Sequence, residues 1–202
     1  MNIINLLTEK QKESLTIKKY SKDQIIYHES SLCNEVCIVL KGSIKIASYS
    51  YEGKEIIYSI IKENEMFGNN LLFSSIPKYK GNVICLSSVE LVSIKKQQVL
   101  QLFEENEKFL EYYLKYDADI FKNLNDKLKI LSFDNAKDRL IYYLLINNKK
   151  IEIDSISYLA STLFLSRECL SRLIHKLQKD GIIEFKSNTI LLKLFGKAEK
   201  SY

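Results

Sequence analysis

The sequence predicts an α+β protein: a β-roll at the N-terminal end, one long helix after it, and a winged helix-turn-helix at the C-terminal end. Three observations lead to this prediction. Residues 19–95 form short β-type runs separated by turn residues. Residues 106–131 carry apolar side chains at steps of three and four, the spacing of one helix face. Residues 153–192 follow the order helix, turn, helix, hairpin.

The composition is that of a soluble protein with a core. Of the 202 residues, 46% are hydrophobic and 27% are charged. Neither a signal peptide nor a run of membrane-spanning length is visible, so we expect a cytoplasmic protein without a membrane partner. Its cysteines are expected to be reduced and form no C-x-x-C pair. They are Cys33, Cys37, Cys85 and Cys169, of which the last two are expected to be small core residues.

Turn residues divide the roll into six expected strands. The turns lie at Lys41-Gly42, around Gly53, and at Pro77. The expected strands are Gln24–Tyr27, Val36–Leu40, Ser43–Tyr49, Glu55–Ile61, Val83–Cys85 and Val89–Ile94. Many short strands at this spacing are typical of a β-roll or jelly roll. A short helix is expected after them, over Gln97–Phe103.

The long helix has an apolar stripe with two sides. One seam contains Phe109, Tyr113, Tyr116, Ile120, Leu124, Lys127 and Leu131. Its flanks contain Leu110, Leu114, Asp117, Phe121 and Leu128. One side of such a helix can pack on its own domain, and the other is then free for a second helix. The same helix of a second chain would give a two-fold dimer, with an ordinary intramolecular helix as the alternative.

The residues after the long helix predict a separate unit. Ser132–Asn135 contains N-capping residue types and is expected to break the helix. Ser155 and Ser166 are expected N-caps, and Gly181 is expected to end the last helix. The expected helices are Ala136–Ile146, Ile156–Leu163 and Arg167–Lys179, and the expected hairpin strands are Ile182–Phe185 and Thr189–Leu192.

The last of these helices has one polar and one apolar face. At 100° per residue, an arc of about 140° contains Arg167, Glu168, Ser171, Arg172 and His175. The opposite side contains Leu170, Leu173, Ile174 and Leu177. A helix of this kind fits the major groove of DNA, with its N-terminal residues nearest the base edges.

Arginine usage and the location of charge favour DNA as the partner. The chain has 27 Lys and three Arg, and Arg167 and Arg172 both lie on this polar face. The guanidinium is a planar fork that can bond guanine O6 and N7 together. Residues 136–202 carry 12 Lys and Arg against 7 Asp and Glu, whereas residues 1–135 are balanced. This asymmetry is typical of a neutral sensor joined to a module that binds a polyanion.

With the pattern Ser166-Arg167-Glu168-x-x-x-Arg172, the chain resembles the Crp/Fnr family of bacterial transcription regulators. Further matching segments are Val39–Ser43, Glu52–Glu55, Phe67-Gly68 and Ala136–Leu140, so the resemblance covers nearly the whole chain. It implies a cyclic-nucleotide-binding-type β-roll as the sensor domain. The implied domains are the sensor at 1–105, a dimerisation helix at 106–131, a hinge at 132–135 and a winged helix-turn-helix DNA-binding domain at 136–202.

By position, the resemblance assigns base reading to Arg167, Glu168 and Arg172, on a G·C-containing half-site of TGTGA or TTGA type. Contacts with DNA phosphates are expected from Ser155, Ser166, Ser171, His175 and Lys176. The implied partners are double-stranded DNA, a second copy of the chain, RNA polymerase and an unidentified small-molecule effector. One position departs from the family: Phe164 replaces the usual turn glycine, and a positive φ there would carry an energetic cost.

The effector pocket departs further from the family's cyclic-AMP binders. Those carry Gly-Glu and then Arg-Ser or Arg-Thr, in which Glu holds the ribose and Arg the phosphate. Here Gly68 is followed by Asn69, and the Arg-Ser positions fall on Tyr79 and Lys80. We therefore expect another effector or a constitutively active roll instead of cyclic AMP. The candidate pocket residues are Gly68, Asn69, Asn70, Lys78, Tyr79 and Lys80, whose lysines could hold an anion as point charges.

No cofactor is predicted. Cys33 and Cys37 are too few and wrongly spaced for an iron–sulfur cluster of the Fnr type. Haem held by His28 and the cysteines stays as an alternative. The alternative function is a protein that senses a ligand, haem or a redox change and acts mainly through protein contacts. An enzyme is not expected, because a metal-dependent roll needs several histidines and only His28 lies there. No nucleophile–base constellation is visible either.

Overall fold

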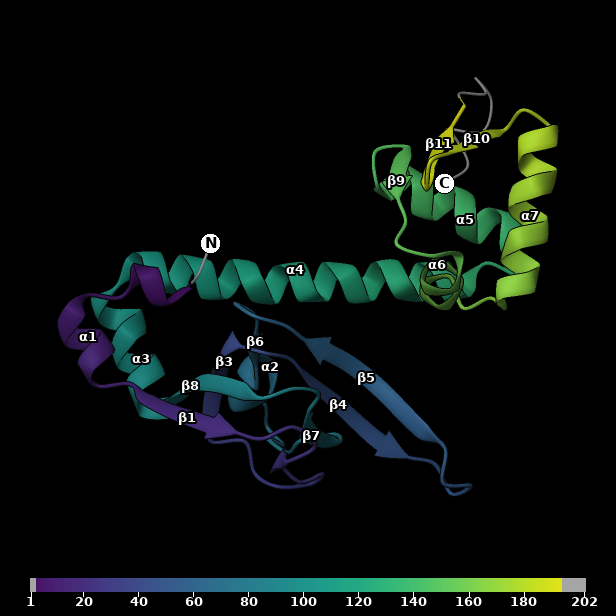
Figure 1. Ribbon diagram of the computed structural model, residues 1–202. Helices are drawn as coiled ribbons and strands as arrows, with labels where there is room; N and C mark the ends of the chain where they lie inside the picture. The colour runs from purple at the N-terminus through teal and green to yellow at the C-terminus, as the bar shows by residue number, and fades with distance from the viewer. Residues whose placement is uncertain (1–2, 194–202) are drawn as a thin grey trace. The chain divides into compact units, whose positions relative to one another are not determined.

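The chain folds as two compact units, Met1–Ala118 and Asp119–Tyr202. The computed structural model describes residues 3–193, so the end of the predicted DNA-binding domain, residues 194–202, lies outside the described residues. The division between the units falls inside the long helix α4 (Glu107–Ser132), which is drawn in teal in Figure 1. Within the described residues no helix is both long and apolar enough to cross a membrane.

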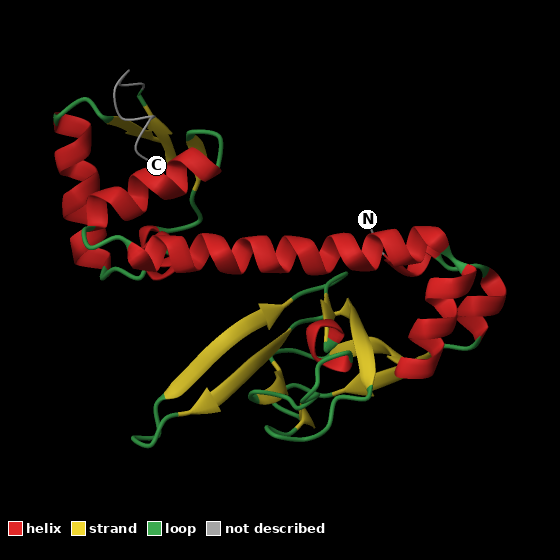
Figure 2. Ribbon diagram, turned by 180° about the vertical axis from the view of Figure 1, so that it is seen from behind, coloured by secondary structure: helices red, strands yellow, loops and turns green. Residues whose placement is uncertain are grey.

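The first unit is a β-roll of two four-stranded antiparallel sheets (Figures 1 and 2). One sheet has the order β1 (Thr16–Tyr20), β8 (Val89–Lys95), β3 (Glu35–Lys41), β6 (Met66–Phe67). The other has the order β2 (Ile25–Tyr27), β7 (Asn82–Cys85), β4 (Ile44–Tyr49), β5 (Glu55–Ile61). All six predicted strands are confirmed to within two residues at each end. The prediction missed β1 and β6.

Short helices accompany the roll. They are η1 (Ile3–Leu6), α1 (Glu9–Glu13), α2 (Asn69–Leu72) and α3 (Lys96–Glu105). The predicted helix after the roll is confirmed as α3, and only Asn106 separates it from α4. The side-chain Oδ1 of Asn106 accepts from the Phe109 N–H at 3.1 Å, so Asn106 caps α4 and does not form its first turn.

Strand β3 is buried on both faces because two cores meet along it. Its alternation directs Val36 and Ile38 toward one core and Cys37 and Val39 toward the other. The first core also contains Phe109 and Tyr113 of α4, together with Ile3, Leu7, Met66, Leu72, Val92, Ile94, Val99 and Leu102. The second is the interior of the roll, with Cys33, Ile44, Phe67, Tyr79, Val83, Cys85, Val89 and Leu91.

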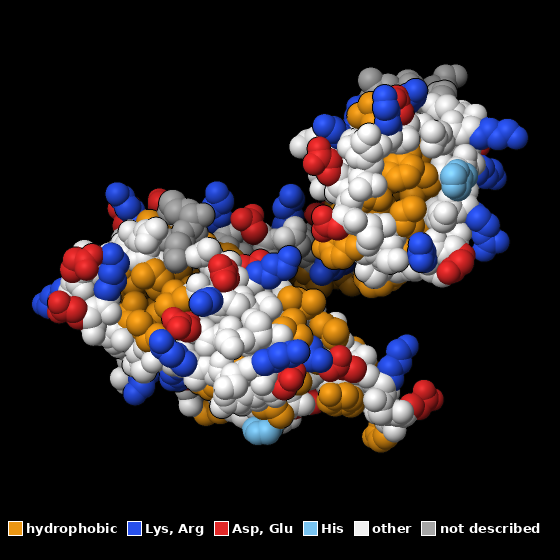
Figure 3. All heavy atoms as spheres, viewed as in Figure 1, with side chains coloured by type: hydrophobic (Ala, Val, Ile, Leu, Met, Phe, Trp, Pro, Cys, Tyr) orange, Lys and Arg blue, Asp and Glu red, His pale blue; other side chains and the backbone are white. Residues whose placement is uncertain are grey.

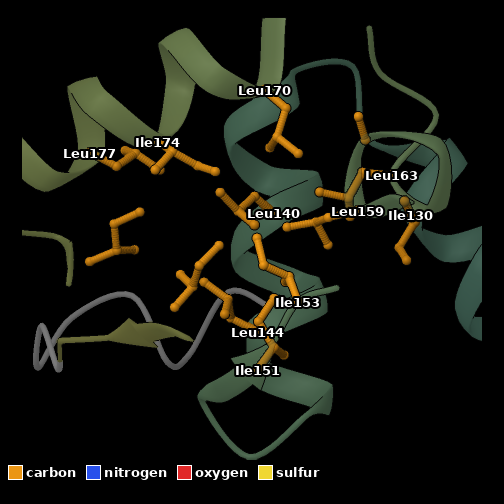
Figure 4. Close-up of a cluster of buried hydrophobic side chains, with 13 residues drawn as sticks. Ile130, Leu140, Leu144, Ile151, Ile153, Leu159, Leu163, Leu170, Ile174 and Leu177 are labelled. Atoms are coloured by element: carbon orange, nitrogen blue, oxygen red, sulfur yellow. The ribbon is translucent and has the colours of Figure 1, made fainter. Parts of the chain in front are cut away.

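The second unit is a winged helix-turn-helix. Its helices are α5 (Ala136–Ile146), α6 (Ile156–Thr162) and α7 (Arg167–Lys179). Its strands form one sheet in the order β10 (Ile183–Lys186), β11 (Thr189–Leu192), β9 (Lys150–Glu152), of which β9 was not predicted. Figure 4 shows the core side chains, which include Ile130, Leu140, Leu144, Leu159, Leu163, Leu170, Ile174 and Leu177.

Side-chain caps define where these helices begin, as predicted. The Asn135 Oδ1 accepts from the Asp138 N–H at 2.9 Å, and the Ser155 Oγ from the Tyr158 N–H at 3.1 Å. Helix α7 ends at Lys179, and Gly181 just beyond it has a left-handed φ of +70°. Ser187 and Asn188 are also left-handed, which fits the two-residue turn of the wing hairpin.

The turn between α6 and α7 has a phenylalanine in a left-handed conformation. Phe164 has a φ of +56°. From the sequence, a positive φ at this residue was expected to carry an energetic cost. The Phe164 N–H bonds the Ser161 carbonyl at 3.2 Å, and the Leu165 N–H bonds the Ala160 carbonyl at 2.9 Å. These two bonds are the Schellman pattern that ends many helices. Without glycine the left-handed residue costs about 1–2 kcal/mol.

We expect Leu140→Ala to lower the free energy of unfolding of the second unit by about 2–5 kcal/mol, because Leu140 is fully buried and its loss leaves a cavity. Urea unfolding followed by circular dichroism measures this. The matched control is Lys137→Ala on the exposed side of the same helix, with a change within about 0.5 kcal/mol. Equal effects of the two substitutions would contradict the packing described for α5.

Candidate functional site

The three predicted base-reading residues lie together on the surface of α7. Arg167, Glu168 and Arg172 are exposed, and with the half-buried Ser171 they line one open hollow of about 520 Å³. The Arg172 Nε donates to the Glu168 carbonyl at 3.3 Å, which holds the side chain along the helix. The site therefore presents two guanidinium groups and a carboxylate within the first two turns of one helix.

The predicted phosphate-contact residues surround this face. The Ser166 Oγ caps α7 by accepting from the Cys169 N–H at 3.1 Å, as the Ser155 Oγ caps α6. An accepting hydroxyl keeps its own hydrogen for donation to an anion. His175 and Lys176 are both exposed further along α7. In Figure 3, Lys and Arg side chains and a histidine line the outer edge of the second unit.

The opposite face of α7 is buried, as its apolar pattern predicted. Leu170, Ile174 and Leu177 are at most 2% exposed and belong to the core of the second unit, and Leu173 packs against it. Cys169 is only half-buried, so the expectation that it is a core residue is wrong. Its position on α7 falls between the polar and the apolar face, where a small side chain keeps partial contact with solvent.

Sequence reasoning missed the role of the third arginine. Arg139 on α5 is half-buried, and its guanidinium donates to the carbonyls of Phe133, Leu163 and Phe164. The scarcity of arginine in this chain was the available signal, because a solubilising cation here is otherwise a lysine.

The long helix α4 exposes a set of large apolar side chains. They are Leu114, Ile120, Phe121, Leu124, Leu128 and Leu131, each between 38% and 65% exposed. At 100° per residue they fall within an arc of about 120°. The predicted seam is divided between two surroundings. Its residues Phe109 and Tyr113 are buried in the first unit, and the exposed face takes three residues from the seam and three from the predicted flanks.

The six candidate effector residues do not share one environment. Gly68, Asn69 and Tyr79 are buried, whereas Asn70, Lys78 and Lys80 are exposed. The Tyr79 ring is in the core of the roll, stacked on Tyr27 with ring centroids 4.7 Å apart. Gly68 has φ of +81°, and a Cβ there would approach the Glu35 carbonyl oxygen to 2.9 Å. The position thus requires glycine for the fold itself.

Asn69, predicted from the sequence to lie at the ribose-binding position, is bonded to the long helix. Its Nδ2 donates to the Asp117 Oδ1 at 2.5 Å, and the Tyr113 hydroxyl donates to its backbone carbonyl at 3.0 Å. The Tyr116 hydroxyl accepts from the Met66 N–H at 2.9 Å and lies 3.1 Å from the Met66 carbonyl. Three successive inward residues of α4 therefore hold the segment around α2.

The thiols of the roll lie in its interior. Cys33 donates to the carbonyls of Glu35 and Gly68, and the Cys37 Sγ lies 3.5 Å from the Tyr27 hydroxyl. Cys33, Cys37 and Cys85 are buried and free, whereas His28 is exposed. Burial raises the pKa of the Cys37 thiol to about 12, so this thiol stays protonated at neutral pH. Among residues 3–193 no group of three or more His, Cys, Asp or Glu side chains is placed to hold a metal ion.

Known proteins resemble this chain in sequence. Residues 17–106 match the family model of the cyclic nucleotide-binding domain. The cAMP-activated global transcriptional regulator CRP of Haemophilus influenzae is 23% identical over 186 residues, covering 87% of this chain and 83% of the relative. The anaerobic regulatory protein of Bacillus subtilis is 24% identical over 193 residues, covering 89% of this chain and 81% of the relative.

The fold resembles that of solved regulators. A variant of CooA from Carboxydothermus hydrogenoformans aligns with a TM-score of 0.65 at 21% identity, covering 96% of this chain and 92% of that structure. Both sequence relatives are named as regulators, in line with the prediction that this chain is not an enzyme. The described chain thus has a cyclic nucleotide-binding domain over residues 17–106 followed by a winged helix-turn-helix, and in sequence and fold it is similar to regulators of the Crp/Fnr type.

Proposed function

We propose that the protein binds DNA sequence-specifically as a dimer, on an inverted repeat, and that cyclic AMP is not its effector. The observation that carries the proposal is the exposed set Arg167, Glu168 and Arg172 on a helix whose opposite face is buried. A planar guanidinium can bond guanine O6 and N7, and a carboxylate can accept from the cytosine amino group. One helix therefore offers groups for both bases of a G·C pair.

Phosphate contacts would orient this helix without reading sequence. Ser155 and Ser166 stand at the N-termini of α6 and α7, where hydroxyl and backbone N–H groups favour anions. Ser171, His175 and Lys176 would add contacts along α7. RNA polymerase is a further proposed partner, on the family resemblance alone.

The exposed face of α4 supports a dimer. Six large apolar side chains exposed on one helix face are costly in water, and a second copy of the same helix would bury them by two-fold symmetry. A two-fold dimer would place two copies of α7 in successive major grooves, about 34 Å apart. This spacing is the reason for proposing an inverted repeat as the operator.

The residues of the candidate effector pocket favour regulation by something other than cyclic AMP, unlike in the cAMP-activated relatives. Asn69 lacks the carboxylate that would hold a ribose, and its amide is engaged with Asp117. Tyr79 stands where an arginine would hold the phosphate, and its ring is packed in the core. These features favour a constitutively active roll or a non-cAMP effector. The protonated Cys37 thiol argues against thiol redox sensing at that position.

Selection of bound fragments from a random duplex library tests this function directly. The purified protein is used without added ligand at near-physiological salt. Recovery of a G·C-containing inverted repeat is the expected result. Recovery of unrelated sequences, bound with an affinity that collapses as salt rises, would show non-specific phosphate binding and contradict the proposal.

We expect Arg167→Ala or Arg172→Ala to weaken binding to the selected operator by about 1–3 kcal/mol and to relax specificity at one base pair. Titration of a panel of single-substituted operators measures both effects. The control is Lys176→Ala, which should weaken binding about equally on all sequences and lower the salt slope by about 1. An arginine variant that behaves like the control would show that the residue contacts only phosphate.

We expect Leu124→Glu to dissociate the dimer, because the carboxylate would be buried against its symmetry mate on the apolar face of α4. Sedimentation equilibrium gives the mass, and fluorescence anisotropy gives the affinity for the full inverted repeat. The control, Lys122→Glu, places the same side chain on the opposite side of the helix and should leave the dimer intact. A dimeric Leu124→Glu variant would refute the proposed interface.

Asp117→Asn tests the bond between α4 and Asn69. Burial raises the pKa of the Asp117 carboxyl above its ordinary value, so its ionised form destabilises the folded state above that raised pKa. Asparagine keeps an acceptor for Asn69 without the charge. At pH 7 the variant should unfold at a higher urea concentration than the wild type. The difference should shrink as the pH falls toward about 4, the ordinary value for Asp. A pH-independent difference would contradict this assignment.

A further inference from the structure

Arg139 joins two segments of the second unit that carry no regular structure. Its Nε donates to the carbonyl of Phe133 at 3.0 Å, between α4 and α5. Its Nη1 donates to the carbonyl of Phe164 at 3.1 Å and, at 3.4 Å, to that of Leu163. The second pair of carbonyls lies in the turn between α6 and α7. One side chain thus connects the hinge after the long helix with the turn before the DNA-reading helix.

The turn that Arg139 contacts contains a residue in a strained backbone conformation. Phe164 is left-handed without being glycine, and it is 46% exposed, so its own side chain is not held in the core. Two backbone bonds close the turn, from the Phe164 and Leu165 N–H groups. The guanidinium adds bonds to carbonyls at the end of α6, which face solvent or a cation in most helices. Arg139 therefore stabilises a backbone conformation that the local sequence disfavours.

Arginine, and not lysine, suits a side chain that must bond both the hinge and the turn. Elsewhere this chain uses lysine for positive charge, with 27 Lys against three Arg, and the other two arginines are on the reading face. A guanidinium donates in fixed directions from several nitrogens, so it can reach the hinge and the turn at once. A lysine ammonium is a single point and could not satisfy both ends.

The position of the turn decides where the reading helix begins. Phe164 lies two residues before Ser166, the N-cap of α7, and Leu165 between them packs against the core. We propose that Arg139 is a positioning residue for DNA reading: it holds the start of α7 in register with the hinge at Phe133. This inference rests on the proposed function, because it assigns α7 as the helix that reads DNA.

The experiment compares Arg139→Lys, Phe164→Gly and the double variant with the wild type. Hydrogen exchange is measured at the amides of Phe164 and Leu165, with the Leu192 amide, bonded to the Lys149 carbonyl, as reference. In Arg139→Lys we expect exchange at the two turn amides to rise about tenfold while the reference is unchanged, since a charged hydrogen bond is lost locally. Lys137→Gln, on the same helix, is the matched control.

DNA affinity gives the second readout. Arg139→Lys should bind the selected operator about tenfold more weakly, with an unchanged salt slope. Phe164→Gly added to that variant should restore most of the affinity, because glycine adopts the left-handed turn without support. Rescue of this kind separates positioning from a general loss of stability.

Three results would overturn the inference. Faster exchange at the reference amide as well would mean that Arg139 stabilises the whole unit. A lower salt slope without rescue by glycine would mean that it contacts phosphate. Unchanged exchange at the turn would mean that it does not hold Phe164. The exchange measurements need no DNA, so they decide the role of Arg139 even if the wild type fails to bind an operator.

Discussion

Burial of one face of α7 is the constraint on which the proposed site depends. Leu170, Ile174 and Leu177 enter the core formed with α5 and α6, and this fixes the rotation of α7 about its own axis. The polar residues at the intervening positions must then face outward together. The arrangement needs no contact between the two arginines, and the Arg172 side chain instead donates to the backbone carbonyl of Glu168. Orientation comes from apolar packing, and chemistry comes from the residue types.

In the roll, too, apolar packing builds the frame, but here the candidate site residues Asn69 and Tyr79 are turned inward instead of outward. Strands β3 and β8 are buried on both faces and form the frame of the roll. The frame matches the family model of the cyclic nucleotide-binding domain. The Asn69 side chain bonds the segment around α2 to Asp117, and the Tyr79 ring lies in the interior. Two of the candidate pocket residues therefore make contacts within the protein itself.

The sequence predicted the features that depend on residues close together in the chain and missed those that depend on residues far apart. The bounds of α5, α7, β5 and β11 were predicted as observed, since caps, glycines and apolar periods are local signals. Strands β1, β6 and β9 were missed: β1 carries two lysines, and the others are two and three residues long. The bonds of Asn69 with Asp117 and of Arg139 with Phe164 link residues that only the fold brings together.

Helix α4 contributes to both cores, through Phe109 and Tyr113 at one end and Ile130 at the other. Within α4 each residue follows the one before it by a rotation of about 100° and a rise of about 1.5 Å. An inserted residue would therefore turn the side chains next to it onto another face of the helix. Loops between domains generally absorb length changes without effect. In α4, by contrast, one residue inserted between Phe109 and Tyr113 would prevent both side chains from facing the core that buries them.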